Sequence, residues 1–264
     1  MTMTVLAELE AGALRAAWPD PAAPGGWRVD PAIKEAILAC FADRTLIDSS
    51  AGPLAFSDRT GVPPRDWSAA PDALAARAAG RPQRVVPGGS SVRAGVHLGP
   101  GVVVMPPSFV NVGAWVGEDA MIDSHVLVGS CAQVGARVHL SAGVQVGGVL
   151  EPANARPVIV EDDAFVGAGC LLLEGVLVGA GAVLGAGTVL TGTSRIYDLV
   201  GGRILQGTPD APLVVPPGAV VVPGSRPARG GFAAEHGLGV ATVLLVKMRD
   251  AGTSARVALE EALR

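Results

Sequence analysis

Aliphatic residues recur at every sixth position through the middle of the chain, and this period limits the possible folds more than any other feature. A break at GVLEPANARP (148–157) divides the positions into two series. All are Val, Leu or Ile: Val92, Leu98, Val104, Val110, Val116, Ile122, Val128, Val134, Leu140, Val146, then Val160, Val166, Leu172, Val178, Leu184, Leu190 and Ile196. An α-helix would place apolar residues at spacings of three, four and seven. Six is a multiple of two, so each aliphatic residue points to the same side of a short β-strand.

Short strands that turn a corner every six residues predict a coil. The residue two positions before each aliphatic is always small, as expected where a corner leaves little room inside. Glycine follows eight of the seventeen aliphatics, and we interpret it as giving the corner its backbone freedom. Three strand-and-corner units would close a triangular coil of about eighteen residues, with successive coils about 4.8 Å apart. We therefore predict a mainly β fold built on a parallel β-helix.

The composition fits a narrow coil and argues against two classes of partner. Glycine accounts for 36 of 264 residues and aromatic residues for 4%, so Val, Leu and Ala must fill the interior. Residues 175–192 carry no charge, but their glycine content and period of six favour corners over a membrane helix. The net charge of −4 comes with no basic stripe. We expect neither a membrane nor a nucleic-acid partner.

Cysteine usage and the N-terminal stretch predict a cytoplasmic protein. Cys40, Cys131 and Cys170 form no CxxC pair, and an odd number of widely spaced thiols suits a reducing compartment. The N-terminal stretch contains Glu8 and Glu10 and lacks the basic region of a signal peptide.

Composition divides the chain into an N-terminal zone (1–84), the repeat zone (85–197) and a C-terminal zone (198–264). Because a solenoid needs capped ends, we expect a mostly helical N-terminal domain and a C-terminal capping segment. The N-terminal helices are expected at 3–17, 31–44 and 69–79, the second with Asp30 as its N-cap and Pro31 in its first turn. In the capping segment we expect a strand at 240–247 and a short helix at 254–263.

Several longer stretches resemble one enzyme family. They are 26–41, RVVPGGSSVRAGV (84–96), 104–152, SRIYDL (194–199), AVVVPGSR (219–226) and LLVKMRD (244–250). The chain resembles the left-handed parallel β-helix acyltransferases and, more narrowly, the tetrahydrodipicolinate N-succinyltransferases. The left hand is implied by this resemblance alone, because a period of six does not determine handedness and parallel crossovers are normally right-handed.

The resemblance implies a reaction and an assembly. Succinyl-CoA would donate its succinyl group to the amine of ring-opened tetrahydrodipicolinate, giving N-succinyl-2-amino-6-oxopimelate in the diaminopimelate route of lysine biosynthesis. The amine would attack the thioester directly, without an acyl-enzyme or a tightly bound cofactor. The enzyme would be a homotrimer with its sites between neighbouring coils. The loop at 148–157 would be a flexible element beside each site.

Three side chains are candidates for holding the acceptor and moving its proton. Arg84, in RVVP, matches the family's substrate arginine, and a guanidinium holds a carboxylate through two parallel hydrogen bonds. Asp123 follows core residue Ile122, so it should point outward. It matches the family's substrate-binding aspartate, and a carboxylate there can bind the ammonium and help remove its proton. Glu174 stands alone in an apolar run. Burial there would suit it to act as an acid or base, so we interpret it as a second catalytic carboxylate. The alternative is a carboxylate exposed on an outer face.

Leu171 marks a departure from the best-known branch of the family, which has a second carboxylate at that position. Acetyl-transferring relatives keep only the glutamate that matches Glu174. Acetyl-CoA therefore stays open as an alternative donor. The SRIYD motif and the long C-terminal segment resemble the succinyl branch, which we favour.

Coenzyme A needs main-chain groups for its pantetheine arm and cations for its phosphates. We predict that Gly147, Gly148, Ala168 and Gly185 lie along the arm and that Lys247 binds a phosphate. Arg195 is a further candidate cation. The glycine-rich runs are not nucleotide loops, because no GxGxxG motif follows a strand and opens a helix.

Two other classes of function are alternatives. A non-catalytic scaffold would explain the coil but neither the interrupting loop nor the paired Arg and Asp. A zinc hydro-lyase on the same coil would need three histidines, two of them five apart. No two of the chain's histidines have that spacing, and we predict no metal site: His97, His125, His139 and His236. We interpret His139 as a structural hydrogen-bonding group and Cys131 as a packing residue.

Overall fold

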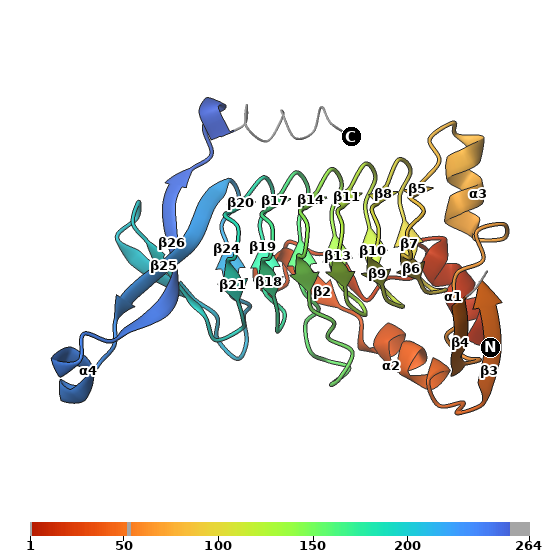
Figure 1. The fold of residues 1–264 in the computed structure, drawn as a ribbon, viewed down its shortest axis with the longest axis horizontal. Helices are drawn as coiled ribbons and strands as arrows, with labels where there is room; N and C mark the ends of the chain where they lie inside the picture. The colour runs from red at the N-terminus through yellow and green to blue at the C-terminus, as the bar shows by residue number, and fades with distance from the viewer. Residues whose placement is uncertain (1, 52–53, 254–264) are drawn as a thin grey trace.

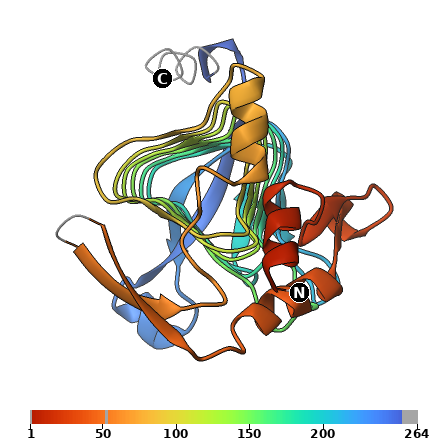
Figure 2. The same ribbon diagram turned by 90° about the vertical axis from the view of Figure 1, so that its right-hand side faces the viewer.

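The computed structural model describes residues 2–51 and 54–253, and its centre is a parallel β-helix. Three sheets form the sides of a triangular prism, seen from the side in Figure 1 and along its axis in Figure 2. Most coil strands are two residues long. Met121 pairs with His139, eighteen positions later, as the repeat predicts.

Each sheet collects every third strand of the coil. Sheet I contains β7 (His97–Leu98), β10 (Trp115–Val116), β13 (Gln133–Val134), β16 (Ile159–Val160), β19 (Leu177–Val178) and β24 (Val214–Val215). Sheet II contains β5 (Arg84–Val85), β8 (Val103–Val104), β11 (Met121–Ile122), β14 (His139–Leu140), β17 (Phe165–Val166) and β20 (Val183–Leu184), followed by β25 (Ala219–Pro227), β26 (Gly239–Met248), β22 (Arg195–Asp198) and β23 (Arg203–Gln206). Sheet III contains β6 (Ser91–Val92), β9 (Phe109–Val110), β12 (Leu127–Val128), β15 (Gln145–Val146), β18 (Leu171–Leu172) and β21 (Val189–Leu190).

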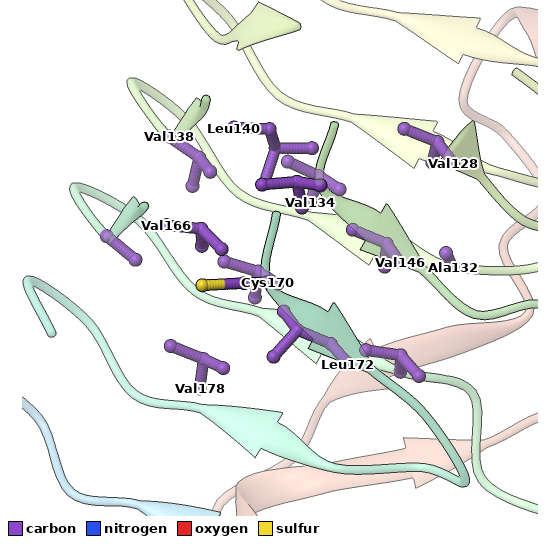
Figure 3. Packing of buried hydrophobic residues seen from close by; sticks show 14 of the residues in the cluster. Val128, Ala132, Val134, Val138, Leu140, Val146, Val166, Cys170, Leu172 and Val178 are labelled. Atoms are coloured by element: carbon purple, nitrogen blue, oxygen red, sulfur yellow. The ribbon is translucent and has the colours of Figure 1, made fainter. Parts of the chain in front are cut away.

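The aliphatic series fills the interior of the prism (Figure 3). Leu140 and Leu172 are fully buried, and the small residue Cys170 lies among them, two positions before Leu172. This confirms the inward orientation that the period of six predicts. Burying a Leu or Val side chain contributes about 1.5–3 kcal/mol, so the stacked series is the main source of the coil's stability.

The glycines that follow the aliphatics have a different role from the one expected. None of these eight has a positive φ. A Cβ on Gly117 would lie 2.5 Å from the amide nitrogen of Ala136, and a Cβ on Gly129 would lie 2.1 Å from that of Gly148. These glycines are required because successive coils touch at the corners. The corner's positive φ occurs two residues later, as at Gly169.

The coil continues beyond residue 197. Ile196 lies in β22, which leaves the prism and pairs with β23 and β26. The sheet I position beside β19 is taken by β24, and β25 extends sheet II beside β20. The β22–β23 hairpin is therefore an insertion before the final coil, and the zone after residue 197 both completes and caps the β-helix.

The rest of the C-terminal zone is a long hairpin that projects from the coil. The strand predicted at 240–247 is confirmed as β26, which runs antiparallel to β25. A short helix, α4 (Gly231–Glu235), lies at the tip of this hairpin (Figure 1). The helix predicted at 254–263 lies outside the residues that the structure describes.

The N-terminal zone mixes helices with hairpins. Its elements are α1 (Thr2–Glu10), β1 (Ala17–Pro19), the 3-10 turn η1 (Pro24–Gly26), β2 (Trp27–Val29), α2 (Pro31–Cys40), β3 (Leu46–Ala51), β4 (Leu54–Arg59) and α3 (Pro71–Ala78). The first helix is shorter than predicted because Gly12 turns the chain with a φ of 75°. The other two predicted helices are present. Asp30 lies at the N-cap of α2 but makes no capping hydrogen bond.

The elements from α1 to α2 lie along one side of the prism (Figure 2). Ala17 and Trp27, in the β1–β2 hairpin, contact Ile159 and Leu177 on the outside of sheet I. The longest helix in residues 2–51 and 54–253 has ten residues, and none of the helices there is long and apolar enough to cross a membrane.

Candidate active site

A cavity of about 1000 Å³ lies on the outer face of sheet II, and we call it the sheet II cavity. Its floor is formed by β11, β14, β17 and β20 with the corners that follow them, and its other wall by residues 247–253. Arg249 holds this wall to the coil through hydrogen bonds of 3.3 Å from Nη1 to the carbonyls of Asp163 and Gly181. Four of the predicted site residues line the cavity: Asp123, Ala168, Gly185 and Lys247.

Asp123 is half-buried at the corner after β11. Its Oδ1 accepts a hydrogen bond from the backbone N–H of Ser124 at 2.8 Å. Its own carbonyl accepts one from the Ser108 hydroxyl at 2.8 Å. The corner backbone is therefore fixed, and the carboxylate lies at the cavity wall as expected of a group that binds an amine.

The corners that contain Ala168 and Gly185 present main-chain donors. In the part of the chain that the structure describes, the N–H groups of Ala168 and Ala186 make no hydrogen bond to protein. Both residues line the sheet II cavity. Such groups can bind the amide carbonyls of an extended ligand, as predicted for a pantetheine arm.

Lys247 lies at the rim of the sheet II cavity and is paired. Its Nζ donates to Oδ2 of Asp250 at 2.7 Å. This bond and those from Thr253 hold the pKa of Asp250 well below its usual range. Because Asp250 offsets the charge of Lys247, an anionic ligand there would have to compete with an existing ion pair.

His139 lines the sheet II cavity, although its sequence position led us to interpret it as a structural hydrogen-bonding group. It is buried in β14, and its ring lies 4.9 Å from that of Phe165 between ring centroids. Both rings line the sheet II cavity beside Met121. The eighteen-residue coil length could have revealed this neighbour, since 139 is 121 plus one coil.

Arg84 lies on the same sheet but outside the cavity. It is exposed in β5, and the register runs from Arg84 to Val103 and then to Met121. Two strand spacings of about 4.8 Å thus separate its backbone from that of Met121. Arg84 could reach a ligand that extends beyond the cavity toward the N-terminal end of the coil.

Glu174 lies at a different corner from Asp123, between sheets III and I. It is exposed, which agrees with the outer-face alternative and not with the burial that an acid–base role would favour. The corner projects from the prism, so its side chains face solvent even within an apolar run. Glu174 has a φ of 55° and precedes Gly175 at 72°, an arrangement that is unfavourable for a residue with a side chain. Its Oε2 accepts a hydrogen bond from the Gly192 N–H at 3.1 Å.

Beside Glu174 is a second cavity, of about 410 Å³, which we call the loop cavity. The inserted loop at 148–157 forms one wall, and residues 208–213 form another. The two candidate catalytic carboxylates of one chain therefore occupy separate cavities.

Gly147 and Gly148 lie at the same type of corner as Glu174 and line neither cavity. A Cβ on Gly148 would lie 2.7 Å from the Ser130 amide nitrogen. Within one chain both glycines serve the stacking of coils, and their predicted CoA contacts do not share the cavity of Ala168 and Gly185.

Cys131 is fully buried at the corner after β12. Burial raises the pKa of its thiol to about 12 against the effect of nearby Lys34. Because the thiolate is the nucleophilic form, a thiol with a raised pKa is a poor nucleophile. This agrees with the interpretation of Cys131 as a packing residue.

Comparison with known proteins adds to this geometry. A family profile described as the hexapeptide repeat of succinyl-transferase matches residues 157–192. The 2,3,4,5-tetrahydropyridine-2,6-dicarboxylate N-succinyltransferase of Xylella fastidiosa (strain Temecula1) is 43% identical over 262 residues, covering 98% of this chain and 86% of that protein. The enzyme of the same name from Idiomarina loihiensis is 43% identical over 98% of this chain and 87% of its own length. The one from Methylobacterium sp. (strain 4-46) is 40% identical over 98% and 87%.

The repeat, the coil and the sheet II cavity define a hexapeptide-repeat acyltransferase. With identity above 40% over nearly the whole chain, the protein belongs to the 2,3,4,5-tetrahydropyridine-2,6-dicarboxylate N-succinyltransferase family.

Proposed function

We propose that this protein transfers the succinyl group of succinyl-CoA to the amine of ring-opened tetrahydrodipicolinate, in the diaminopimelate route of lysine biosynthesis. The observation that carries the proposal is the sheet II cavity, where a carboxylate, free main-chain donors and a lysine meet. Ligand sites are typically about 300–1,000 Å³, so the cavity can hold a large part of an acyl-CoA. The names of the relatives support the choice of reaction.

The chemistry assigned to the residues is direct acyl transfer. The amine nitrogen attacks the thioester carbonyl carbon, a C–N bond forms, and the C–S bond breaks. The nitrogen loses a proton and the departing thiolate of CoA gains one. Before the attack, Asp123 binds the ammonium form and accepts the proton that frees the nitrogen lone pair, and the second proton, lost as the C–N bond forms, passes to the thiolate. The N–H groups of Ala168 and Ala186 hold the pantetheine arm. Arg84 binds a carboxylate of the acceptor.

A homotrimer with sites between neighbouring copies completes the proposal. Asp123 and Glu174 lie at different corners of one coil, so one chain does not bring them together. A neighbouring copy packed against sheet III or its corners would let Glu174 of one chain approach Asp123 of another. The same packing would bring Gly147 and Gly148 toward the donor. We place the enzyme in the cytoplasm, because its three cysteines are free, buried thiols.

The acyl donor is the part of the proposal that an assay tests directly. Free-thiol release is measured with succinyl-CoA and with acetyl-CoA, each with and without tetrahydrodipicolinate. We expect acceptor-dependent release from succinyl-CoA, with Leu171 tolerated at its place in sheet III. Preference for acetyl-CoA would move the protein to the acetylating branch. Release from neither donor would reject the proposed function.

A further inference from the structure

Lys34 is a wholly buried lysine whose ammonium is bound by two backbone carbonyls. It lies on α2, with 0% of its surface exposed. Its Nζ donates to the carbonyl of Ala155 at 2.7 Å and to that of Pro152 at 3.3 Å. Burying an ammonium is costly unless hydrogen bonds compensate, and burial lowers the pKa of Lys34. Both carbonyls belong to the loop at 148–157, more than a hundred residues away in sequence.

The two carbonyls are the ends of one turn. The Ala155 N–H donates to the Pro152 carbonyl at 2.9 Å, so Lys34 binds the turn at both ends. A second tie joins the same loop to the N-terminal zone, because Nη1 of Arg156 donates to the Trp27 carbonyl at 3.0 Å. The N-terminal zone therefore sets the shape of a loop that interrupts the coil.

This turn is also a wall of the loop cavity. Pro152, Ala155 and Arg156 line it together with Glu174. A displacement of the turn would change the space next to the candidate second carboxylate. No residue of this loop lines the sheet II cavity, so the coenzyme contacts assigned to Ala168, Ala186 and Lys247 would be unaffected. Gly148 lies at the start of the loop, outside the 152–155 turn that Lys34 binds.

We propose that Lys34 is a positioning residue for acyl transfer, which holds the 148–157 turn in the shape that the reaction needs beside Glu174. This inference rests on the proposed function. Lys34 touches neither donor nor acceptor, and it acts through the loop. A purely structural role would instead show as lost stability, with CoA binding and turnover falling together.

The test compares Lys34→Met and Lys34→Arg with the wild type. Met reproduces the unbranched lysine side chain as far as Cε and cannot donate a hydrogen bond, whereas Arg keeps charge and donors. The released carbonyls lie on a partly exposed loop where water can replace Nζ, so the fold should persist. Glu35→Gln, at an exposed position next to Lys34 on the same helix, is the matched control.

We expect Lys34→Met to lower kcat by about 10- to 100-fold, the loss that a small misplacement of a site can cause. The Kd for CoA, measured by calorimetry, should stay within about twofold, a margin too small for a lost hydrogen bond. Hydrogen exchange should become faster in 148–157 and remain unchanged in the coil. Lys34→Arg should recover part of kcat, and Glu35→Gln should match the wild type.

An unchanged kcat in folded Lys34→Met would overturn the inference, as would parallel losses of kcat and CoA binding. If Lys34→Met does not fold, Arg156→Met removes the other hydrogen bond between the loop and the N-terminal zone, the one to the Trp27 carbonyl. An unchanged kcat in Arg156→Met would also overturn the inference. Absence of succinyl transfer in the wild type would instead reject the proposed function. The two failures are thus distinguishable.

Discussion

At the residue scale, the corners of the coil decide which side chains meet a ligand. Asp123 follows the sixth aliphatic of the series and Glu174 the thirteenth. Seven units is not a multiple of three, so Glu174 lies one corner further round the prism. Ala168 and Gly185 follow the twelfth and fifteenth aliphatics, six and nine units from Asp123. These two residues therefore share its corner and its cavity.

Asp123 tests the assignment of proton transfer. Asp123→Asn keeps an acceptor for the Ser124 N–H but removes the charge, and Asp123→Ala removes both. We expect both variants to keep their fold and to lose at least about 100-fold in kcat/KM, the lower range for a lost general base. Glu118→Gln changes an exposed carboxylate of the same coil, paired with Arg81, and should leave activity near the wild-type value. Normal turnover in Asp123→Ala would remove Asp123 from the site.

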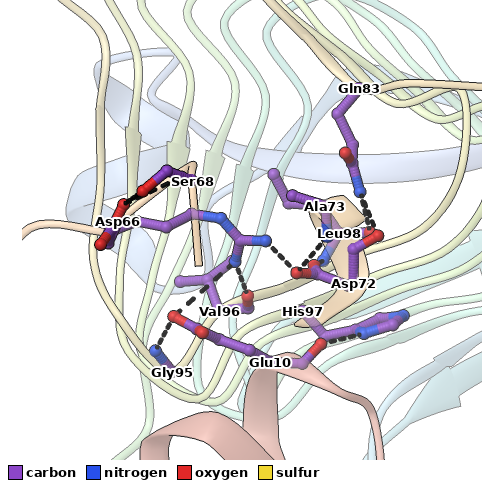
Figure 4. Close-up of polar contacts among 11 residues, drawn as sticks. Glu10, Asp66, Ser68, Asp72, Ala73, Gln83, Gly95, Val96, His97 and Leu98 are labelled. Carbon is purple, nitrogen blue, oxygen red and sulfur yellow. Dashed lines mark hydrogen bonds and ion pairs between the residues drawn. The ribbon is translucent and has the colours of Figure 1, made fainter. Parts of the chain in front are cut away.

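At the element scale, buried charges close the N-terminal end of the coil (Figure 4). The two oxygens of Asp72 accept hydrogen bonds from Arg65 and from the Leu98 N–H, the latter at 2.7 Å. Glu10 accepts one from the Gly95 N–H at 3.0 Å. These side chains satisfy backbone groups that the end of a coil would otherwise leave unpaired.

His97 lies within this cap and predicts how stability depends on pH. Its Nδ1 is 2.8 Å from the Glu10 carbonyl, and its ring stacks on Trp115 with centroids 5.1 Å apart. Burial lowers the pKa of His97 below its ordinary 6.5. The hydrogen bond with the Glu10 carbonyl and the charge of Asp72 both raise this pKa, but the effect of burial is larger. Arg15 and Arg65 also act to lower it.

The unfolded chain therefore protonates at this histidine before the folded one does. The free energy of unfolding should fall as the pH drops below about 6.5, by at most about 1.4 kcal/mol per pH unit. Urea unfolding at pH 7.0 and 5.5 measures this slope, and His97→Gln should reduce it. Glu10 has the opposite sign, because burial raises the pKa of its carboxyl, and the comparison with His97→Gln separates the two groups. Equal slopes in the wild type and in His97→Gln would show that His97 does not cause the pH dependence.

At the scale of the whole molecule, exposed apolar side chains agree with the proposed assembly. Leu46 and Phe56 on the β3–β4 hairpin are 63% and 51% exposed, and Phe232 on α4 is 71% exposed. The α4 end of its hairpin projects from the coil in Figure 1, and the β3–β4 hairpin extends away from the coil in Figure 2. Apolar surfaces of this kind commonly mark contacts between subunits.

Mixed trimers test whether a site is shared between copies. Asp123→Ala and Glu174→Gln chains, each with a different affinity tag, are co-expressed and purified through both tags. If each site takes Asp123 from one copy and Glu174 from its neighbour, some sites in mixed trimers contain both native residues. Activity should then recover to roughly a third of wild type, because a mixed trimer of either composition has one native pairing among its three interfaces. No recovery over either single variant would contradict the shared site.

Much of the coil could be predicted from the sequence. Side chains alternate along a strand, so a period of six is enough to place Val128, Leu140 and Leu172 inside and to locate nearly every strand. The corner shared by Asp123, Ala168 and Gly185 follows from the same count. These features depend on local geometry repeated without change.

The tertiary structure alone decided the features that depend on distant segments. The β22–β23 hairpin displaces Ile196 from sheet I, because Val214 and Val215 take its place beside β19. The exposure of Glu174 depends on how far its corner projects, and its cavity on an inserted loop. Lys34 reads in sequence as an ordinary helix residue. Its burial and its carbonyl partners arise only when α2 packs against a loop more than a hundred residues away, a contact that no local pattern encodes.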